Sequence, residues 1–159
     1  MDTTDRKILA TLQENGRMTN VELARLNNLA PSSMLERVRR LEERGIIGGY
    51  RAELNPKEIG YNVEAFVMIV LDHHQATGIE DFESSIRGVP EVRSCVHVAG
   101  RYDYILHVAV RDIDHLGDLI KHRLGSLAGV EKQETFLVLS TVKRDEGYSL
   151  EQLFNNENK

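Results

Sequence analysis

The chain has 159 residues, of which 41% are hydrophobic and 28% charged, and a formal net charge of −5, which together predict a globular protein and exclude a disordered or fibrous one. Its one cysteine, Cys95, excludes an intrachain disulfide, and the longest apolar run, 65–71, is far shorter than the ~20 residues that cross a bilayer. Because the first residues lack the basic and apolar regions of a secretory signal, we expect a cytoplasmic protein without a membrane partner.

Charge is unevenly distributed along the chain. Residues 1–60 carry ten Lys and Arg against nine Asp and Glu, a balance of +1, whereas residues 61–159 carry ten against sixteen, a balance of −6. Four of the arginines in the first part lie within the segment 30–47 (APSSMLERVRRLEERGII). A basic segment on an otherwise acidic protein indicates one surface that meets a polyanion.

The first third of the chain predicts three short helices, and the first two are recognised by their ends. Residues 4–16 place apolar side chains at helical spacing and stop at Gly16. Residues 19–28 begin with Thr19, followed three positions later by Glu22, which is the pattern of a capping box. In this second helix we expect three residues to be buried: Val21, Ala24 and Leu26.

The third helix is predicted to follow a short turn. Pro31 suits its first position, because proline has no N–H to lose there, and Gly45 suits the residue just past its end. The stripe expected to be buried consists of Met34, Leu35, Val38 and Leu41. The opposite face is polar and basic, with Arg37 on its flank, and carries Ser32, Ser33, Glu36, Arg39 and Arg40.

Two helices joined by a tight turn, the second with a basic outer face, are typical of a helix-turn-helix. In that motif the second helix enters the major groove of DNA. The alternative is a solvated charged helix, in which Glu36 and Arg40 form an ion pair one turn apart.

The remainder of the chain changes to strand periodicity. Residues 47–60 are glycine-rich and turn at 55–56, which indicates a linker strand and turn. The elements predicted after it, in the order strand, helix, strand, strand, helix, strand, span 62–72, 78–88, 91–100, 102–112, 113–125 and 130–144. This βαββαβ order is that of a ferredoxin-like domain, so the predicted fold class is α+β. Residues 149–154 are a candidate for a last short helix.

This combination resembles the Lrp/AsnC, or feast/famine, family of transcriptional regulators over essentially the whole chain. The segments that carry the resemblance are 4–24 (TDRKILATLQENGRMTNVELA), 29–47 (LAPSSMLERVRRLEERGII), 98–112 (VAGRYDYILHVAVRD) and 134–143 (ETFLVLSTVK). It implies an N-terminal, winged-helix-like helix-turn-helix domain over 1–46, a linker strand and turn over 47–60, and a ferredoxin-like effector-binding and oligomerisation domain over 61–159. Ala30 departs from the pattern, because the family usually has a capping serine there.

A DNA-reading helix needs side chains for base edges and for phosphates. Two serines near the helix N-terminus are short donors, and the long side chains of Arg37 and Arg40 can reach guanine edges, so we rank these two as the groove residues. Arg39 is ranked as a phosphate contact. The full candidate set is Ser32, Ser33, Glu36, Arg37, Arg39 and Arg40.

Residues 100–103 (GRYD) close the hairpin between the second and third strands. The resemblance implies that this turn lines a cleft between dimers that binds a small molecule, commonly an amino acid. Backbone N–H groups near Gly100 and Tyr102 would then bind the carboxylate of the ligand, and Asp103 its ammonium group. The alternative is that glycine and aspartate only form the turn. The candidate effector residues are Gly100, Arg101, Tyr102, Asp103, Thr135 and Ser140.

One further group of residues is considered as a metal site. If the hairpin pairs symmetrically, His97 lies opposite His107, with Cys95 on the same face of the sheet. Two imidazoles and a thiol can bind zinc or copper, but such histidines are more often ordinary core or interface residues. We therefore predict no metal and no cofactor, with the question of these three residues left open.

An enzyme is excluded, because the chain has no clustered acid and base, no glycine-rich phosphate loop and no nucleophile in a recognised motif. We predict a sequence-specific DNA-binding transcriptional regulator whose assembly and DNA binding are modulated by a small effector, an amino acid by the resemblance. Its partners are then double-stranded DNA, the effector and further copies of the chain, as a homodimer and beyond it a tetramer or octamer. The alternatives are an architectural DNA-binding protein without an effector and a metabolite sensor with little DNA affinity.

Overall fold

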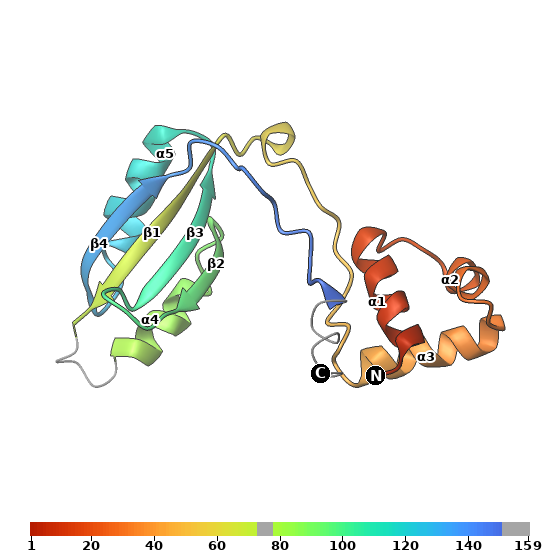
Figure 1. The fold of residues 1–159 in the computed structure, drawn as a ribbon. Helices are drawn as coiled ribbons and strands as arrows, with labels where there is room; N and C mark the ends of the chain where they lie inside the picture. Colours follow the sequence, from red (N-terminus) through yellow and green to blue (C-terminus); the bar gives the residue numbers. More distant parts are fainter. Residues whose placement is uncertain (73–77, 151–159) are drawn as a thin grey trace. The chain divides into compact units, whose positions relative to one another are not determined.

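The computed structural model describes residues 1–72 and 78–150, and its contacts divide the chain into two compact units (Figure 1). The first unit contains Met1–Glu53 together with the described residues from 143 onward, and the second is Leu54–Val142. The sequence placed the end of the chain in the C-terminal domain, whereas its described contacts lie within the first unit. Most of the candidate last helix, 149–154, lies outside the described residues.

The first unit is a three-helix domain built from α1 (Thr3–Glu14), α2 (Asn20–Leu26) and α3 (Pro31–Glu43). The expected local signals are confirmed, since Thr19 and Glu22 form a capping box at α2 and Pro31 occupies the first turn of α3. Gly45 follows α3 with a φ of +67°, a conformation that favours glycine. Ala30 gives α3 no side-chain cap. The core of this domain consists of Ile8, Leu23, Ala24, Met34, Val38 and Leu41.

Three residues expected in that core are exposed, so this part of the prediction was wrong. Val21 is 48% exposed, Leu26 62% and Leu35 55%. In α2 the buried pair is Leu23 and Ala24, and Val21 and Leu26 each lie about 110° round the helix from the midpoint of that pair. Leu35 lies about 100° from Met34, outside the narrow stripe that meets the other two helices.

The linker strand expected over 47–60 is absent from this part of the described chain. A short 3₁₀ turn, η1 (Lys57–Ile59), forms instead, and the N–H of Tyr61 donates to the carbonyl of Pro56 at 2.9 Å. A strand requires a partner for its backbone groups, and no other described strand of this chain pairs with the segment.

The second unit has the predicted βαββαβ order. Its elements are β1 (Val63–Leu71), α4 (Gly78–Ile86), β2 (Val92–His97), β3 (Tyr104–Val110), α5 (Ile113–Asp118) continued by the π-helical turn η2 (Leu119–Leu124), and β4 (Val130–Leu137). The four strands form one antiparallel sheet in the order β2-β3-β1-β4. The α+β, ferredoxin-like prediction is therefore confirmed.

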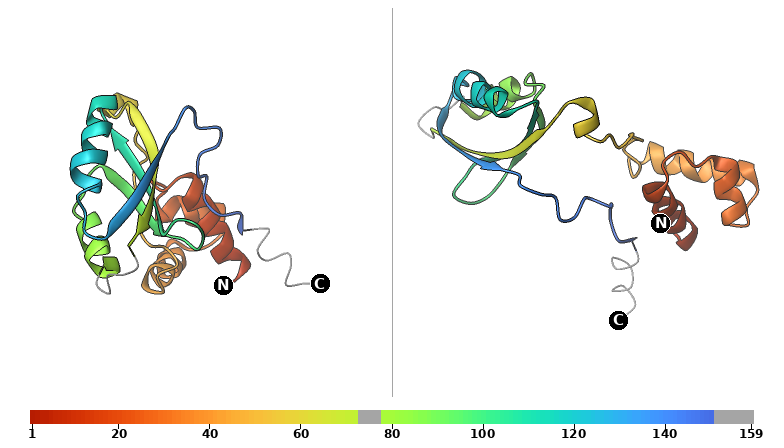
Figure 2. Two further views of the ribbon diagram at one scale, coloured as in Figure 1. Left: turned by 90° about the vertical axis from the view of Figure 1, so that its left-hand side faces the viewer. Right: turned by 90° about the horizontal axis from the view of Figure 1, so that it is seen from above.

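The helices of this unit cover one face of the sheet (Figure 2). Alternate residues of the strands point into that side, as a half-buried strand requires. The core that they form with the helices includes Ala65, Val67, Ile69, Leu71, Tyr104, Leu106, Val108, Val110, Phe82, Ile86, Leu116, Leu119 and Leu124. The other face, here called the open face, carries the intervening residues, among them Phe66, Met68, Val96, His107 and Phe136.

The register of the hairpin differs from the symmetric pairing that we expected. His97 pairs with Tyr104, and His107 pairs with Ser94, because the loop spans residues 98–103 and sets one register for all of these pairs. His97 therefore stacks on Tyr104 on the helix-covered side, whereas His107 stacks on Phe66 on the open face. The proposed group of Cys95, His97 and His107 is not brought together.

Candidate functional site

The outer face of α3 presents five of the six DNA-binding candidates to solvent. They are exposed along one side of the helix, starting at its first turn, and comprise Ser32, Ser33, Glu36, Arg39 and Arg40. Free N–H groups at a helix N-terminus favour a phosphate, and serine hydroxyls beside them add short donors. This face can therefore contact both the backbone and the base edges of a duplex.

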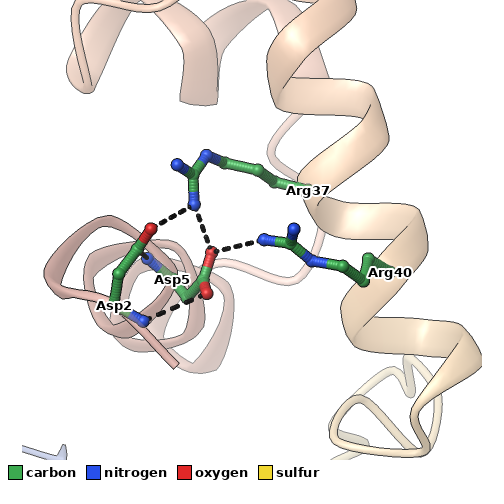
Figure 3. Close-up of polar contacts among 4 residues, drawn as sticks. All are labelled: Asp2, Asp5, Arg37 and Arg40. Carbon is green, nitrogen blue, oxygen red and sulfur yellow. Dashed lines mark hydrogen bonds and ion pairs between the residues drawn. The ribbon is translucent and has the colours of Figure 1, made fainter.

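Arg37, the sixth candidate, points toward α1 rather than outward (Figure 3). Its Nη1 lies 2.6 Å from an oxygen of Asp2 and 2.7 Å from an oxygen of Asp5. The side chain of Asp5 is only 3% exposed, so its charge depends on partners within the domain. These contacts raise the pKa of Arg37. The ranking of Arg37 as a groove residue is therefore revised, since its guanidinium joins α3 to α1.

The same two aspartates form the N-terminal cap of α1. Asp2 accepts the backbone N–H of Asp5 at 2.8 Å, and Asp5 accepts the N–H of Asp2 at 3.2 Å. The hydrogen bond from the Asp5 backbone, followed by the one from Arg37, lowers the pKa of Asp2. The N-terminus of α1 is thus fixed both to its own first turn and to α3.

The side chains of Arg39 and Arg40 form ion pairs with different partners. Arg39 pairs with Glu43 one turn along at 2.8 Å, with both side chains more than half exposed, and such pairs hold a side chain weakly. Arg40 is half exposed and approaches Asp5 at 3.7 Å. Of the two groove candidates in the sequence, Arg40 is the one whose side chain remains largely on the outer surface.

The second candidate site is the loop between β2 and β3. The hydroxyl of Tyr102 donates to the carboxylate of Glu134 on β4, and this hydrogen bond raises the pKa of Tyr102. The guanidinium of Arg101 lies over the ring of Tyr102, 4.6 Å from its centre. A cation, a phenol and a carboxylate from two parts of the chain thus form one polar cluster.

Asp103 has a structural role in this loop. One of its carboxylate oxygens accepts the backbone N–H of Leu71 at 2.8 Å, and its own N–H donates to the carbonyl of Ile69 at 2.9 Å. The side chain therefore holds the loop against the end of β1. For the carboxylate oxygen that accepts the N–H of Leu71, this contact supports the alternative in which Asp103 forms the turn.

The two other effector candidates lie away from this cluster. Thr135 pairs with Val67, whose side chain is in the helix-covered core, so Thr135 and Glu134 lie on opposite faces of β4. Ser140 was expected on the last strand, but β4 ends at Leu137 and Ser140 is exposed beyond it. The sequence analysis did not include Glu134, although the alternation of β4 places it on the face opposite Thr135.

The open face of the sheet is apolar at its centre. Phe66 pairs directly with Phe136, and the two are 40% and 43% exposed. Phe66 also stacks on His107 with 5.0 Å between ring centres, and His107 lies 2.7 Å from Glu64. Two neighbouring exposed aromatic rings on a regular surface are typical of an interaction site.

Among the described residues, no helix is long and apolar enough to cross a membrane. In the same part of the chain, no three His, Cys, Asp or Glu side chains lie together in a way that could hold a metal ion.

Comparison with known proteins agrees with both parts of the structure. Residues 1–47 match the winged helix-turn-helix DNA-binding family, and residues 64–148 match the Lrp/AsnC ligand binding domain. The chain is 39% identical over 144 residues to the leucine-responsive regulatory protein of Klebsiella pneumoniae, which covers 91% of this chain and 88% of that protein. The corresponding protein of Escherichia coli K12 is 38% identical over 144 residues, which again cover 91% of this chain and 88% of that protein.

Solved structures of transcriptional regulators are also similar to this chain over most of its length. A transcriptional regulator from Neisseria meningitidis in complex with L-methionine has a TM-score of 0.92 and 36% identity, covering 97% of this chain and 99% of that one. The feast or famine regulatory protein of M. tuberculosis complexed with L-methionine has a TM-score of 0.85 and 36% identity, over 92% of this chain and 97% of that one.

A helix-turn-helix domain followed by a ligand-binding ferredoxin-like domain defines a class of effector-modulated DNA-binding regulators. The chain belongs to the Lrp/AsnC family. It is a transcriptional regulator and not an enzyme, as predicted, and the comparisons favour this function over the two alternatives considered from the sequence.

Proposed function

We propose that this regulator responds to an amino acid with an apolar side chain, such as leucine or methionine, bound beside the loop 98–103. The observation that carries the proposal is the polar cluster of Arg101, Tyr102 and Glu134. It is supported by the two similar structures that hold L-methionine and by the relatives named for their response to leucine. Since its target is chromosomal DNA, we infer a cytoplasmic location.

The cluster offers the groups that a free amino acid requires. Arg101 and the backbone N–H groups near Gly100 are donors for the carboxylate of the ligand. Its ammonium group needs an acceptor, and the carboxylates of Glu134 and Asp103 lie in this region, each with more lone pairs than the one hydrogen bond described for it uses. Glu134 therefore joins the proposed site, whereas Thr135 and Ser140 are less well placed.

The proposed assembly is a homodimer formed through the open face, with tetramers or octamers built from it. A sheet covered by helices on one side only leaves its other side to be buried by a partner, and a second copy offers the same apolar surface. An amino acid bound between copies would favour one arrangement over another, and it could thereby change the spacing of the DNA-binding domains.

Replacing Asp103 with asparagine tests the ammonium acceptor without removing the loop contact. Asparagine keeps an oxygen that can accept the N–H of Leu71, but it removes the negative charge. In the parent, L-leucine or L-methionine at 100 times its Kd should stabilise the protein by about 2.7 kcal/mol in a thermal-shift assay. The variant should fold normally and lose most of this effect, as should Glu134→Gln if it shares the role. Full stabilisation of both variants would contradict the assigned acceptors.

For DNA, we propose that Arg40, Ser32, Ser33 and Glu36 face the base edges and that Arg39 contacts phosphate. Arg40→Ala should weaken binding to the preferred sequence by about 1–3 kcal/mol and relax sequence preference, because a base contact is lost. Arg39→Ala should weaken all sequences alike and reduce the salt dependence. Fluorescence anisotropy with selected and random duplexes measures both, and thermal unfolding confirms that the variants are folded. Parent-like binding by both variants to both duplexes would remove the groove assignment.

A further inference from the structure

We infer that α1 carries a docking surface for the chain's own C-terminal segment, residues 143–150, so that the DNA-binding unit is built from both ends of the chain. The contact centres on Gln13, an exposed residue near the end of α1. Its side-chain Nε2 donates to the carbonyl of Tyr148 at 3.1 Å, and its Oε1 accepts the N–H of Tyr148 at 2.7 Å. One amide side chain thus satisfies both backbone groups of a residue 135 positions away.

The backbone beside this contact has the shape that it requires. Gly147 has a φ of +88°, and a Cβ at that position would lie 2.4 Å from Oε1 and 2.9 Å from Cδ of Gln13. A larger residue at this position would therefore displace the side chain of Gln13. The N–H of Gly147 donates to Asp145 at 2.9 Å, a local turn that presents the next residue to α1.

A second contact lies at the start of the segment. Arg144 pairs with Glu53 at 2.9 Å, near the end of the first stretch of this unit. Both side chains are mostly exposed, so the pair contributes little affinity by itself. Its position agrees with the placement of Tyr148 against Gln13.

The docking has a consequence for how the two units are joined. The second unit, Leu54–Val142, is attached to the DNA-binding unit through the linker at one end and through the docked segment at the other. Only residues 138–142 separate β4 from that segment. β4, which carries Glu134, is joined covalently to the docked segment, which is hydrogen-bonded to α1, and α1 is ion-paired to Arg37 of α3, so these contacts connect β4 to the DNA-reading helix. This consequence rests on the proposed effector site, whereas the docking does not.

Amide hydrogen exchange on the full-length protein tests the docking directly. Gln13→Ala removes both hydrogen bonds without touching the core, and Gly147→Ala places a Cβ in the space that the Gln13 side chain occupies. Both variants should speed exchange in residues 143–150 and at the end of α1 by about threefold or more. Gly60→Ala is the control, because Gly60 has a similar φ of +92° but no atom within 4 Å of the added Cβ. In this control, amide exchange in residues 143–150 and at the end of α1 should be the same as in the parent.

Three results would overturn the inference. The first is parent-like exchange in the Gln13 and Gly147 variants, and the second is unprotected exchange of residues 143–150 in the parent. The third tests whether the segment docks on its own chain, and it uses a mixture of Gln13→Ala chains with chains ended after Val142. If the intact segment of the first chain restored protection to α1 of the second, the segment would dock on another copy. Docking within one chain predicts no restoration.

Discussion

Replacing Arg37 with alanine should destabilise the DNA-binding unit by about 2 kcal/mol, because the buried carboxylate of Asp5 loses its shortest partner. Two other contacts of this carboxylate are longer, at 3.2 Å to the N–H of Asp2 and 3.7 Å to Arg40. For a unit of this size, the loss corresponds to a fall of about 10 °C in the unfolding midpoint. Calorimetry on the full chain measures it, and hydrogen exchange of α1 and α3 assigns the change to this unit.

Arg39→Ala is the matched control for this experiment. It removes an arginine from the same helix, but its ion pair with Glu43 is exposed, so the midpoint should hardly change. The comparison is made at pH 7. The pKa of Asp2 is lowered in the folded state, so its ionised carboxylate stabilises the fold fully when the pH is above 3.8, the ordinary pKa of the group. This stabilisation is lost as the pH falls through the pKa of Asp2 in the folded protein. Equal midpoints for the two variants would show that Arg37 does not hold α1 to α3.

A charge on the open face should dissociate the proposed dimer. In Phe66→Glu, a carboxylate would lie where two copies of the sheet meet, and burying it without a partner costs about 3 kcal/mol or more, which weakens association at least about 100-fold. The fold should persist, since Phe66 is 40% exposed and contributes nothing to the helix-covered core. Sedimentation velocity across a range of concentrations measures the change in assembly.

Ile79→Glu provides the comparison for the open face. Ile79 is similarly exposed, at 46%, but lies on α4 on the helix-covered side of the sheet. This variant should sediment as the parent does. If Phe66→Glu kept the parent's assembly, or if Ile79→Glu disrupted it equally, the dimer would not form through the open face.

The features that the sequence predicted correctly are encoded locally. The capping box of Thr19 and Glu22, the proline at the start of α3 and the glycine after it each act within a few residues. The βαββαβ order likewise follows from changes in hydrophobic period along the chain. Local signals of this kind determine where elements begin and end, and they were sufficient for the fold class.

The features that the sequence missed depend on partners far away in the chain. Nothing near Arg37 indicates that Asp2 and Asp5 bind its guanidinium, because these residues are more than thirty positions apart. The metal hypothesis failed because the six-residue loop 98–103 sets the hairpin register, which pairs His97 with Tyr104 and His107 with Ser94. The docking of Tyr148 on Gln13 joins opposite ends of the chain and has no local signature.

The central claim is that DNA binding by this chain depends on an amino acid, and a binding titration tests it most directly. A preferred duplex is first selected from a random library, and its affinity is then measured by fluorescence anisotropy with and without saturating L-leucine or L-methionine. We predict that the selected duplex binds about 1,000-fold or more tightly than random DNA, and that one of the amino acids changes this affinity by about fivefold or more. Equal affinity for selected and random DNA, or titrations that no common amino acid alters, would contradict the account.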